Sequence, residues 1–499
     1  MINRAKNITY NNLAQGIYQL LAILAGLYLT KYIIINFGSE LNGLLVSTNQ
    51  ILGYFALVEA GISGCVTYAL YKPLYDANEN EINSLLRTSK SHFFKAGFMF
   101  ICLTITYLFF IIGFESHTSL DKQDLLFFII VLAIPKLLQI LLLSKYLAIF
   151  VSGKKQYIIS LASAAFIITN FLVIVISTRT GCDLAKVKLF AVIATIVQIL
   201  VFAGFFKYFW PRYHFSSSKT EDKLKNRNDV FWNQVISNLI VGLPIFLTSI
   251  LLDLKTVSVV SLYLLLIHSI SGFISIWSNN LIPHFGEILI SKEKYLAEKI
   301  FKNYEYYYFL LLTYSFGCAI FLMPKFLELY TKGIEDGNYI QPGIMKACLL
   351  LGVLNMIRAP GVVLMEADGR FKVTKSQLIL QLASAILLGI FLASFFGLLG
   401  LLSGIAISQL LRNFQTFSYT GKIYPFINTK NTYKYLVVIC LSLLINHMTT
   451  LIFEPLFTGY LDFVIYSIVV FIANFFVVFF IFEYFNDYGS IKIIMKKLK

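Results

Sequence analysis

The chain has 499 residues, of which 58% are hydrophobic and only 13% are charged, and its mean hydropathy is +0.75. A soluble chain of this length cannot keep so much apolar surface out of water, so the composition excludes a soluble protein. The formal net charge of +15 would indicate nucleic-acid binding in a soluble protein, but in a membrane protein the placement of the cations matters more. We expect an all-α, polytopic membrane protein that contacts the lipid bilayer and no nucleic acid.

The apolar runs predict about fourteen transmembrane helices, because about 20 residues suffice to cross the hydrocarbon core of a bilayer. In chain order these runs lie at about 9–36, 41–71, 94–114, 125–149, 158–178, 185–208, 230–252, 256–288, 305–328, 343–366, 377–396, 398–420, 435–452 and 461–484. No small-residue cleavage pattern follows the first run, so we expect it to stay in place as a membrane span.

The Lys and Arg residues follow the positive-inside pattern. Of the 41, roughly 30 fall on or beside alternate connections of this segmentation, and the connection 179–188 is a local exception. An even number of spans places both termini on one side of the membrane. Basic residues at both ends identify that side as the cytoplasm: Arg4, Lys6, Lys492, Lys496, Lys497 and Lys499.

The first half of the chain has a counterpart about 215 residues downstream. A long apolar helix with a polar tail occurs at 41–91 and again at 257–299, and the loops 153–157 and 369–373 lie 216 residues apart. An even number of spans in each half predicts two parallel six-helix repeats around a central cavity. The domains we expect are a six-helix lobe at 1–210, a cytoplasmic linker at 211–229, a second lobe at 230–425, and two additional helices with a basic tail at 426–499.

Ionisable residues at bilayer depth are candidates for function, because each needs a partner, a water-filled cavity or a role in transport. At 1.5 Å per residue, Glu59 lies about 27 Å and Arg358 about 22 Å from the outer ends of their helices. The two side chains can meet if both face one cavity. Arg358 then offers a planar fork to a phosphate or carboxylate, and Glu59 holds it or takes a proton. The alternative is a structural ion pair between helices.

Three further residues are candidates for substrate binding or ion coupling. Lys136 follows Pro135 near the middle of the fourth span, and Lys31 lies only about 8 Å from the outer end of the first span. Both are candidate cations of the cavity, with snorkelling to the interface as the alternative. His268 is a candidate proton carrier, because its ordinary pKa lies near neutral pH. A hydrogen-bonded buried histidine is the alternative for His268.

Enzyme signatures are missing from the sequence. It has no nucleophile elbow, HExxH motif or Walker loop, and its six cysteines form no CxxC pair. We therefore predict no catalytic residues, no bound metal and no cofactor. Any uphill transport would draw on a proton or sodium gradient, with Glu59 and His268 as the candidate coupling groups, or on a downstream step that consumes the product.

Several segments resemble a known family. FGSELNGL at 37–44, ALVEAGI at 56–62, YALYKPL at 68–74 and GKKQY at 153–157 are similar to motifs of bacterial polysaccharide-unit flippases. These proteins are the O-antigen and capsule translocases of the multidrug/oligosaccharidyl-lipid/polysaccharide exporter superfamily. The family often has an arginine in the outer part of span one. Lys31 stands near that place, although lysine cannot offer the same bidentate fork.

The resemblance implies a two-lobed transporter with alternating access in the bacterial inner membrane. Its substrate would be undecaprenyl-diphosphate-linked oligosaccharide, moved from the cytoplasmic to the periplasmic leaflet during O-antigen, lipopolysaccharide or capsule biosynthesis. A polysaccharide polymerase and a chain-length regulator are the expected partners. A cation-coupled multidrug antiporter of the same superfamily and a flippase for lipid-linked peptidoglycan precursors stay open. From a different class, a membrane polysaccharide polymerase also stays open.

Overall fold

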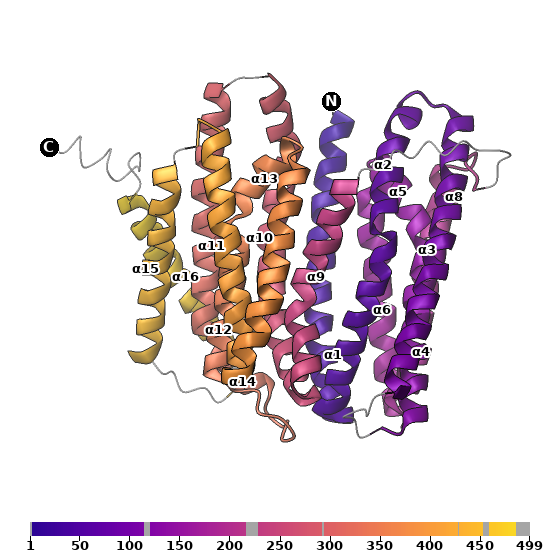
Figure 1. The fold of residues 1–499 in the computed structure, drawn as a ribbon, viewed down its shortest axis with the longest axis horizontal. Coiled ribbons are helices and arrows are strands. Elements are labelled where there is room, and N and C mark those ends of the chain that lie inside the picture. The colour runs from indigo at the N-terminus through magenta and orange to yellow at the C-terminus, as the bar shows by residue number, and fades with distance from the viewer. Residues whose placement is uncertain are drawn as a thin grey trace. The chain divides into compact units, whose positions relative to one another are not determined.

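The computed structural model describes residues 2–113, 120–215, 228–291, 294–427, 429–452 and 459–485. These residues form α-helices and no β-strand (Figure 1). The first nine helices are α1 Ile2–Ala56, α2 Ala60–Tyr75, α3 Glu79–Gly113, α4 Lys122–Leu138, α5 Ser144–Ser152, α6 Gln156–Arg179, α7 Leu184–Phe190, α8 Val192–Phe209 and α9 Asn228–Leu251. The others are α10 Leu254–Ser291, α11 Lys294–Tyr330, α12 Pro342–Ile357, α13 Ala359–Ala367, α14 Phe371–Ile423, α15 Thr429–Ile452 and α16 Tyr460–Phe485.

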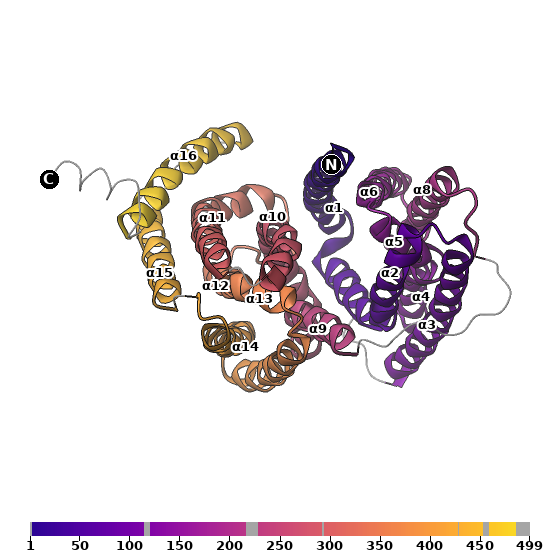
Figure 2. The same ribbon diagram turned by 90° about the horizontal axis from the view of Figure 1, so that it is seen from above.

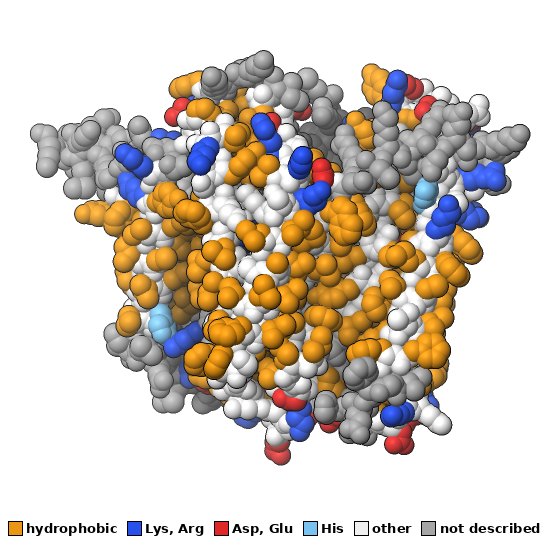
Figure 3. Space-filling model, in the orientation of Figure 1, with side chains coloured by type: hydrophobic (Ala, Val, Ile, Leu, Met, Phe, Trp, Pro, Cys, Tyr) orange, Lys and Arg blue, Asp and Glu red, His pale blue; other side chains and the backbone are white. Residues whose placement is uncertain are grey.

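Twelve helical segments of the described chain are long and apolar enough to cross a membrane. Two of them, Leu13–Tyr75 with 63 residues and Phe371–Ile423 with 53 residues, are long enough to cross twice, since about 20 residues span the hydrocarbon core. Hydrophobic side chains cover the sides of the helices, and Lys and Arg gather near their ends (Figure 3). The chain is therefore an all-α, multi-pass membrane protein, as its composition predicts.

Each of the two longest helices is interrupted by a glycine. Gly38 in α1 has φ 86° and ψ 163°, and Gly397 in α14 has φ 56° and ψ −135°. Side chains with a Cβ rarely adopt such angles, so glycine permits the chain to turn there and to begin a second arm. The predicted boundaries between spans one and two and between spans eleven and twelve are confirmed, and the described helices accommodate the fourteen predicted spans.

The chain divides into two compact units, residues 1–258 and 259–499. The division falls inside α10, so α9 belongs to unit 1, whereas the predicted linker 211–229 precedes α9. Residues 216–227 of that linker and the predicted basic tail at 486–499 lie outside the described residues. The predicted lobe boundaries stay predictions.

Unit 1 is built around apolar contacts of α1 to α8. One buried cluster joins α1, α3 and α4 through Leu52, Phe100 and Ile129, each at most 1% exposed.

At the start of α10, Asn42 Nδ2 donates to Ser258 Oγ at 2.7 Å. These two residues lie 216 positions apart, the offset that the sequence predicts between the repeats. The contact anchors the first turn of α10 on the second arm of α1.

In unit 2, the two arms of α14 form a tight helical hairpin (Figures 1 and 2). A Cβ atom on Gly404 would collide with the backbone of Leu388 and Gly389 in the first arm, and one on Gly400 would collide with Leu392 O. Small residues at this four-residue spacing permit close packing of helices. The two glycines thus let the arms of α14 pack closely within this one chain.

The last two helices pack on α11 through buried polar contacts. Thr432 Oγ1 of α15 donates to Glu305 Oε1 at 2.6 Å, and the hydroxyl of Tyr306 donates to Glu483 Oε1 of α16 at 2.9 Å. Glu305 is 4% exposed and Glu483 7% exposed. Because a buried carboxylate needs hydrogen-bond donors, these contacts fix α15 and α16 against the rest of unit 2.

Candidate functional site

In unit 1, Glu59 lies at a break between helices. A 3₁₀ turn at Leu57–Glu59 separates α1 from α2. The hydroxyl of Ser144 donates a hydrogen bond to Glu59 Oε2 at 2.6 Å, and the Lys136 ammonium interacts electrostatically with the Glu59 carboxylate. Glu59 and Lys136 are both half-buried. The structure thus brings two predicted site residues together, with one charge of each sign.

A local irregularity positions Ser144 and Lys136. Pro135 in α4 lacks a backbone N–H and frees one carbonyl of the preceding turn. Four residues later a π-helical turn at Gln139–Leu143 joins α4 to α5, and Ser144 is the first residue of α5. Such wide turns inside helices often occur at functional sites. The π-turn thus follows Pro135 and leads directly into Ser144, the hydrogen-bond donor to the Glu59 carboxylate.

In unit 2, Arg358 also lies at a helix break. It follows α12 and precedes α13, where Pro360 occupies the first turn. Its side chain donates from Nη1 to Leu354 O at 3.3 Å and to Asn413 Oδ1 at 3.4 Å, and from Nη2 to Asn355 Oδ1. All three acceptors are uncharged. At 7% exposure, the guanidinium is therefore buried without a direct carboxylate partner among the described residues.

A second buried arginine, Arg412, lies in the second arm of α14. Its Nη1 donates to Gln381 Oε1 of the first arm at 2.8 Å, while its Nε has no hydrogen-bond partner within the described chain. Arg412 interacts electrostatically with Arg358 and with the half-buried Glu366. Two guanidinium groups and one carboxylate thus share this region, and we call Arg358, Arg412 and Glu366 the arginine cluster.

Our sequence interpretation missed Arg412 and Glu366. A usable signal existed for Arg412, because it interrupts the predicted span 398–420 and an ionisable group at that depth needs a partner. Glu366 carried no such signal, since it ends the predicted span 343–366 and resembles a solvated interfacial residue. Only the fold shows that it lies within electrostatic reach of Arg412.

The remaining predicted residues have different surroundings. Lys31 is half-buried on the first arm of α1, seven residues before Gly38. His268 lies on α10 with an exposed side chain, and both its role as a proton carrier and the alternative of a hydrogen-bonded buried histidine stay predictions. Glu59 and Arg358 belong to different compact units. Their mutual pairing, and the transport roles of all five residues, stay predictions.

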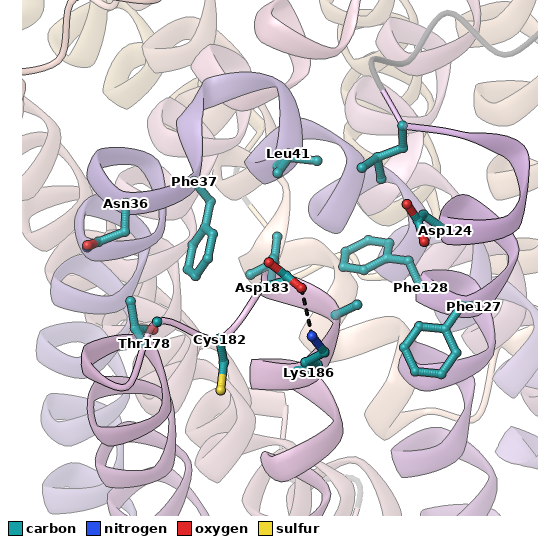
Figure 4. A pocket seen from close by; sticks show the side chains of 14 residues that line it. Asn36, Phe37, Leu41, Asp124, Phe127, Phe128, Thr178, Cys182, Asp183 and Lys186 are labelled. Carbon is teal, nitrogen blue, oxygen red and sulfur yellow. Dashed lines mark hydrogen bonds and ion pairs between the residues drawn. The ribbon is translucent and has the colours of Figure 1, made fainter.

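Unit 1 also has a pocket of about 690 Å³ near the turn at Gly38 (Figure 4). It is lined from α1, α4, α6, α7 and the connection between α6 and α7, and the polar or charged members include Asn36, Asp124, Thr178, Asp183 and Lys186. Lys186 Nζ and Asp183 Oδ2 form an exposed ion pair at 3.0 Å. Among the described residues, no three His, Cys, Asp or Glu side chains come together so as to hold a metal ion.

No protein-family model matches this chain, and no curated protein is similar to it in sequence. Solved structures are similar in fold. An inward-facing MATE family multidrug resistance transporter of the MOP superfamily matches with TM-score 0.62 and 16% identity, over 85% of this chain and 95% of the other. The lipid II flippase MurJ in an inward closed conformation matches with TM-score 0.63 and 15% identity, over 95% of this chain and 98% of the other.

A MOP superfamily transporter from Pyrococcus furiosus matches with TM-score 0.53 and 14% identity, over 83% of this chain and 95% of the other. For that transporter, a reverse polarity of the binding pocket has been taken to suggest a different function. At such identities the likeness concerns the fold. This chain therefore has the fold of MOP-superfamily transporters, a superfamily with both multidrug transporters and a lipid-linked substrate flippase among its members.

Proposed function

We propose that this protein is a flippase for lipid-linked oligosaccharide. Its substrate would be an undecaprenyl-diphosphate-linked repeat unit of an O-antigen or capsular polysaccharide, moved from the cytoplasmic to the periplasmic leaflet by alternating access. The likeness in fold to MurJ, a lipid II flippase, supports a lipid-linked substrate. Localisation to the bacterial inner membrane with both termini in the cytoplasm belongs to the same proposal. So does cooperation with a polymerase and a chain-length regulator.

The observation that carries the proposal is the surplus of positive charge in the arginine cluster. Arg358 and Arg412 are 7% and 6% exposed and interact electrostatically with each other, and among the described residues Glu366 is the carboxylate that interacts with Arg412. Burying an ion without a counter-ion is costly, because water no longer solvates it. An anion that enters this region would remove that cost, and a diphosphate is an anion that arginine binds through parallel hydrogen bonds.

The chemistry of the substrate fits this arrangement. A diphosphate with several sugars cannot cross hydrocarbon unaided, so a protein must neutralise the phosphates and solvate the sugars while the prenyl chain stays in lipid. Arg358 is held here by uncharged acceptors on Leu354, Asn355 and Asn413. Phosphate oxygens accept stronger, charge-assisted hydrogen bonds and would displace these acceptors. In this mechanism Arg358 and Arg412 bind the headgroup, and release returns Arg358 to the two asparagines.

The test is deletion of the gene in the parent bacterium, followed by measurement of lipid-linked oligosaccharide and surface polysaccharide. Complete repeat units should accumulate on the carrier lipid and the surface glycan should be lost. The wild-type gene should restore both, and Arg358→Ala should restore them weakly. Arg370→Ala is the matched control, because Arg370 is exposed and paired with Asp368 at 2.7 Å. Normal surface glycan in the deletion strain would refute the proposal.

The second candidate is a cation-coupled multidrug antiporter, favoured by the half-buried carboxylate of Glu59 and by the likeness in fold to MATE transporters. In this case Glu59 or the exposed His268 would bind a coupling proton or sodium ion. Altered drug tolerance with normal surface glycan in the deletion strain would identify this function. A membrane polysaccharide polymerase has less support, because the solved structures that share this fold are transporters.

A further inference from the structure

A groove of about 400 Å³ runs between the two arms of α14. Its polar lining comes from both arms and consists of Ser376, Gln377, Gln415, Ser418, Tyr419 and Lys422. The groove lies near the two ends of α14, Phe371 and Ile423, which the positive-inside pattern assigns to the cytoplasmic side. A polar groove at this depth is therefore at the level of the lipid headgroups of the inner leaflet.

Apolar side chains flank the polar lining. Leu380 and Phe414 belong to the groove and are 51% and 67% exposed. Further along the same two arms, Leu387 and Leu411 are 69% and 46% exposed. Exposed leucine and phenylalanine side chains in a membrane-spanning helix contact lipid chains. The groove thus combines a polar floor for a headgroup with an apolar wall for the attached chain.

A ladder of polar contacts leads from the groove towards the arginine cluster. Thr416 Oγ1 donates to Gln377 Oε1 at 3.3 Å, and Arg412 Nη1 donates to Gln381 Oε1 at 2.8 Å. Gln377 and Gln381 are four residues apart on the first arm, and Arg412 and Thr416 are four apart on the second. Such residues are neighbours on one helix face. The two contacts are therefore successive rungs between the arms.

The contact between Arg412 and Gln381 leaves two hydrogen-bond donors unused. Gln381 Nε2 and Arg412 Nε have no partner in the described part of the chain, although Gln381 is 1% and Arg412 6% exposed. A buried donor without an acceptor destabilises the protein, because it has lost its hydrogen bond to water. These two donors favour a ligand that accepts hydrogen bonds and carries negative charge. Phosphate oxygens meet both conditions.

From the groove, its apolar wall and the unused donors, we infer a site on α14 for the phosphate headgroup of an anionic lipid of the inner leaflet. Lys422 and the amide of Gln377 bind the phosphate at the headgroup level, and Gln381 and Arg412 are the next donors along the ladder. The lipid chain lies along Leu380 and Phe414. Resting on the proposed function, this inference makes α14 the place where a lipid-linked diphosphate first binds before it reaches Arg358.

The test uses the purified full-length protein and native mass spectrometry with two lipids, dioleoyl phosphatidic acid and dioleoyl phosphatidylcholine. The wild type should retain phosphatidic acid preferentially. Lys422→Gln should weaken that retention roughly fivefold, the effect of one cation beside an anionic lipid. Gln377→Met should weaken it further in combination with Lys422→Gln. Lys372→Gln is the matched control, because Lys372 is an exposed cation in the first turn of α14 that does not line the groove.

Equal retention by the wild type and Lys422→Gln would overturn the inference, and so would equal losses in Lys422→Gln and Lys372→Gln. Displacement of the lipid by millimolar inorganic phosphate would also overturn it, because the groove would then bind a soluble anion. Lipid retention does not require transport. Retention that depends on Lys422, in a protein whose deletion leaves surface glycan normal, would uphold this site and refute the flippase.

Discussion

The two compact units differ in the balance of positive and negative charge at their buried or half-buried ionisable residues. In unit 1, Glu59 and Lys136 carry one charge of each sign, and Ser144 donates to the carboxylate. In unit 2, Arg358 and Arg412 carry two positive charges near the single carboxylate of Glu366. Glu59 and Lys136 are half-buried, whereas Arg358 and Arg412 are buried. At its helix break, unit 1 therefore pairs one acidic with one basic side chain, whereas two basic side chains and one acidic side chain lie at the break of unit 2.

In both units the backbone departs from regular α-helix at a charged residue. Glu59 ends a 3₁₀ turn and lies near a π-turn, and Arg358 separates α12 from α13. A helix break at membrane depth leaves backbone groups that must find partners within the protein. In both units the break coincides with a predicted charged residue, but the charge balance differs.

The largest effect should follow Glu366→Gln, which removes the counter-charge of the arginine cluster. The two buried arginines would then repel each other without the carboxylate that interacts with Arg412, and leaving a buried charge uncompensated costs several kcal/mol. Because Glu366 is half-buried, we expect a loss of about 3 kcal/mol in the free energy of unfolding, measured by denaturant titration in micelles. Glu328→Gln, in the partly exposed pair with Lys325 at 3.1 Å, should cost less than about 1 kcal/mol. Equal losses in the two variants would show that the Glu366 carboxylate does not offset the charge of the buried arginines.

A smaller loss should follow Gly404→Val, which tests whether the α14 hairpin holds Gln381 against Arg412. The new Cβ would collide with the backbone of Leu388 and Gly389. Overpacking of this kind costs about 1 to 3 kcal/mol. Gly204→Val in α8 is the control, because a Cβ there meets no atom within 4 Å. Thermal unfolding of both purified variants measures the difference, and equal stability would contradict the tight contact.

The balance in unit 1 predicts energetic coupling between Glu59 and Lys136. Glu59→Gln and Lys136→Met should each destabilise the protein, and the double variant should lose less than the sum of the two. We expect a coupling energy on the order of 1 to 2 kcal/mol from a double-mutant cycle of unfolding free energies. The exposed pair Arg212 and Glu79, at 3.4 Å, should couple by less than about 0.5 kcal/mol. Coupling no larger than in this control pair would show that Lys136 does not neutralise Glu59.

The smallest effect should occur outside both charge sets, at the start of α10. Burial opposes ionisation of Asp253, but hydrogen bonds from the hydroxyl and backbone N–H of Thr256, at 2.6 and 2.9 Å, lower its pKa below the ordinary 3.8. A depressed pKa contributes stability that is present above pH 3.8 and is lost as the pH falls through the folded value. Asp253→Ala should cost less than about 1 kcal/mol at pH 7 and progressively less as the pH falls below 3.8.

Unfolding at pH 7 and at pH 3 measures this contribution, with Asp183→Ala as a control on another exposed carboxylate. A loss at Asp253 as large as that at Glu366 would mean that surface capping matters as much as the buried charge balance. The difference in buried charge between the two units would then not account for the difference in stability loss.

Much of the fold could be predicted because the bilayer restricts the choices. In hydrocarbon every backbone group must be satisfied within the protein, so long apolar runs must be helices. The turns at Gly38 and Gly397 follow from a glycine between two such runs. Less of the candidate site could be predicted. The sequence identifies Glu59, Lys136 and Arg358 as costly charges at depth, and it supplies no means of choosing their partners.

By itself, then, the sequence determined the all-α, multi-pass membrane fold and the helices with their two glycine turns, because length and hydropathy act along the chain. The tertiary structure decided which charges meet. Ser144 reaches Glu59 across 85 residues, and Arg412 lies near Arg358 and Glu366 because the arms of α14 pack against α12 and α13. Contacts between helices depend on which faces pack together. That choice is made by the whole assembly of helices, and no local pattern encodes it.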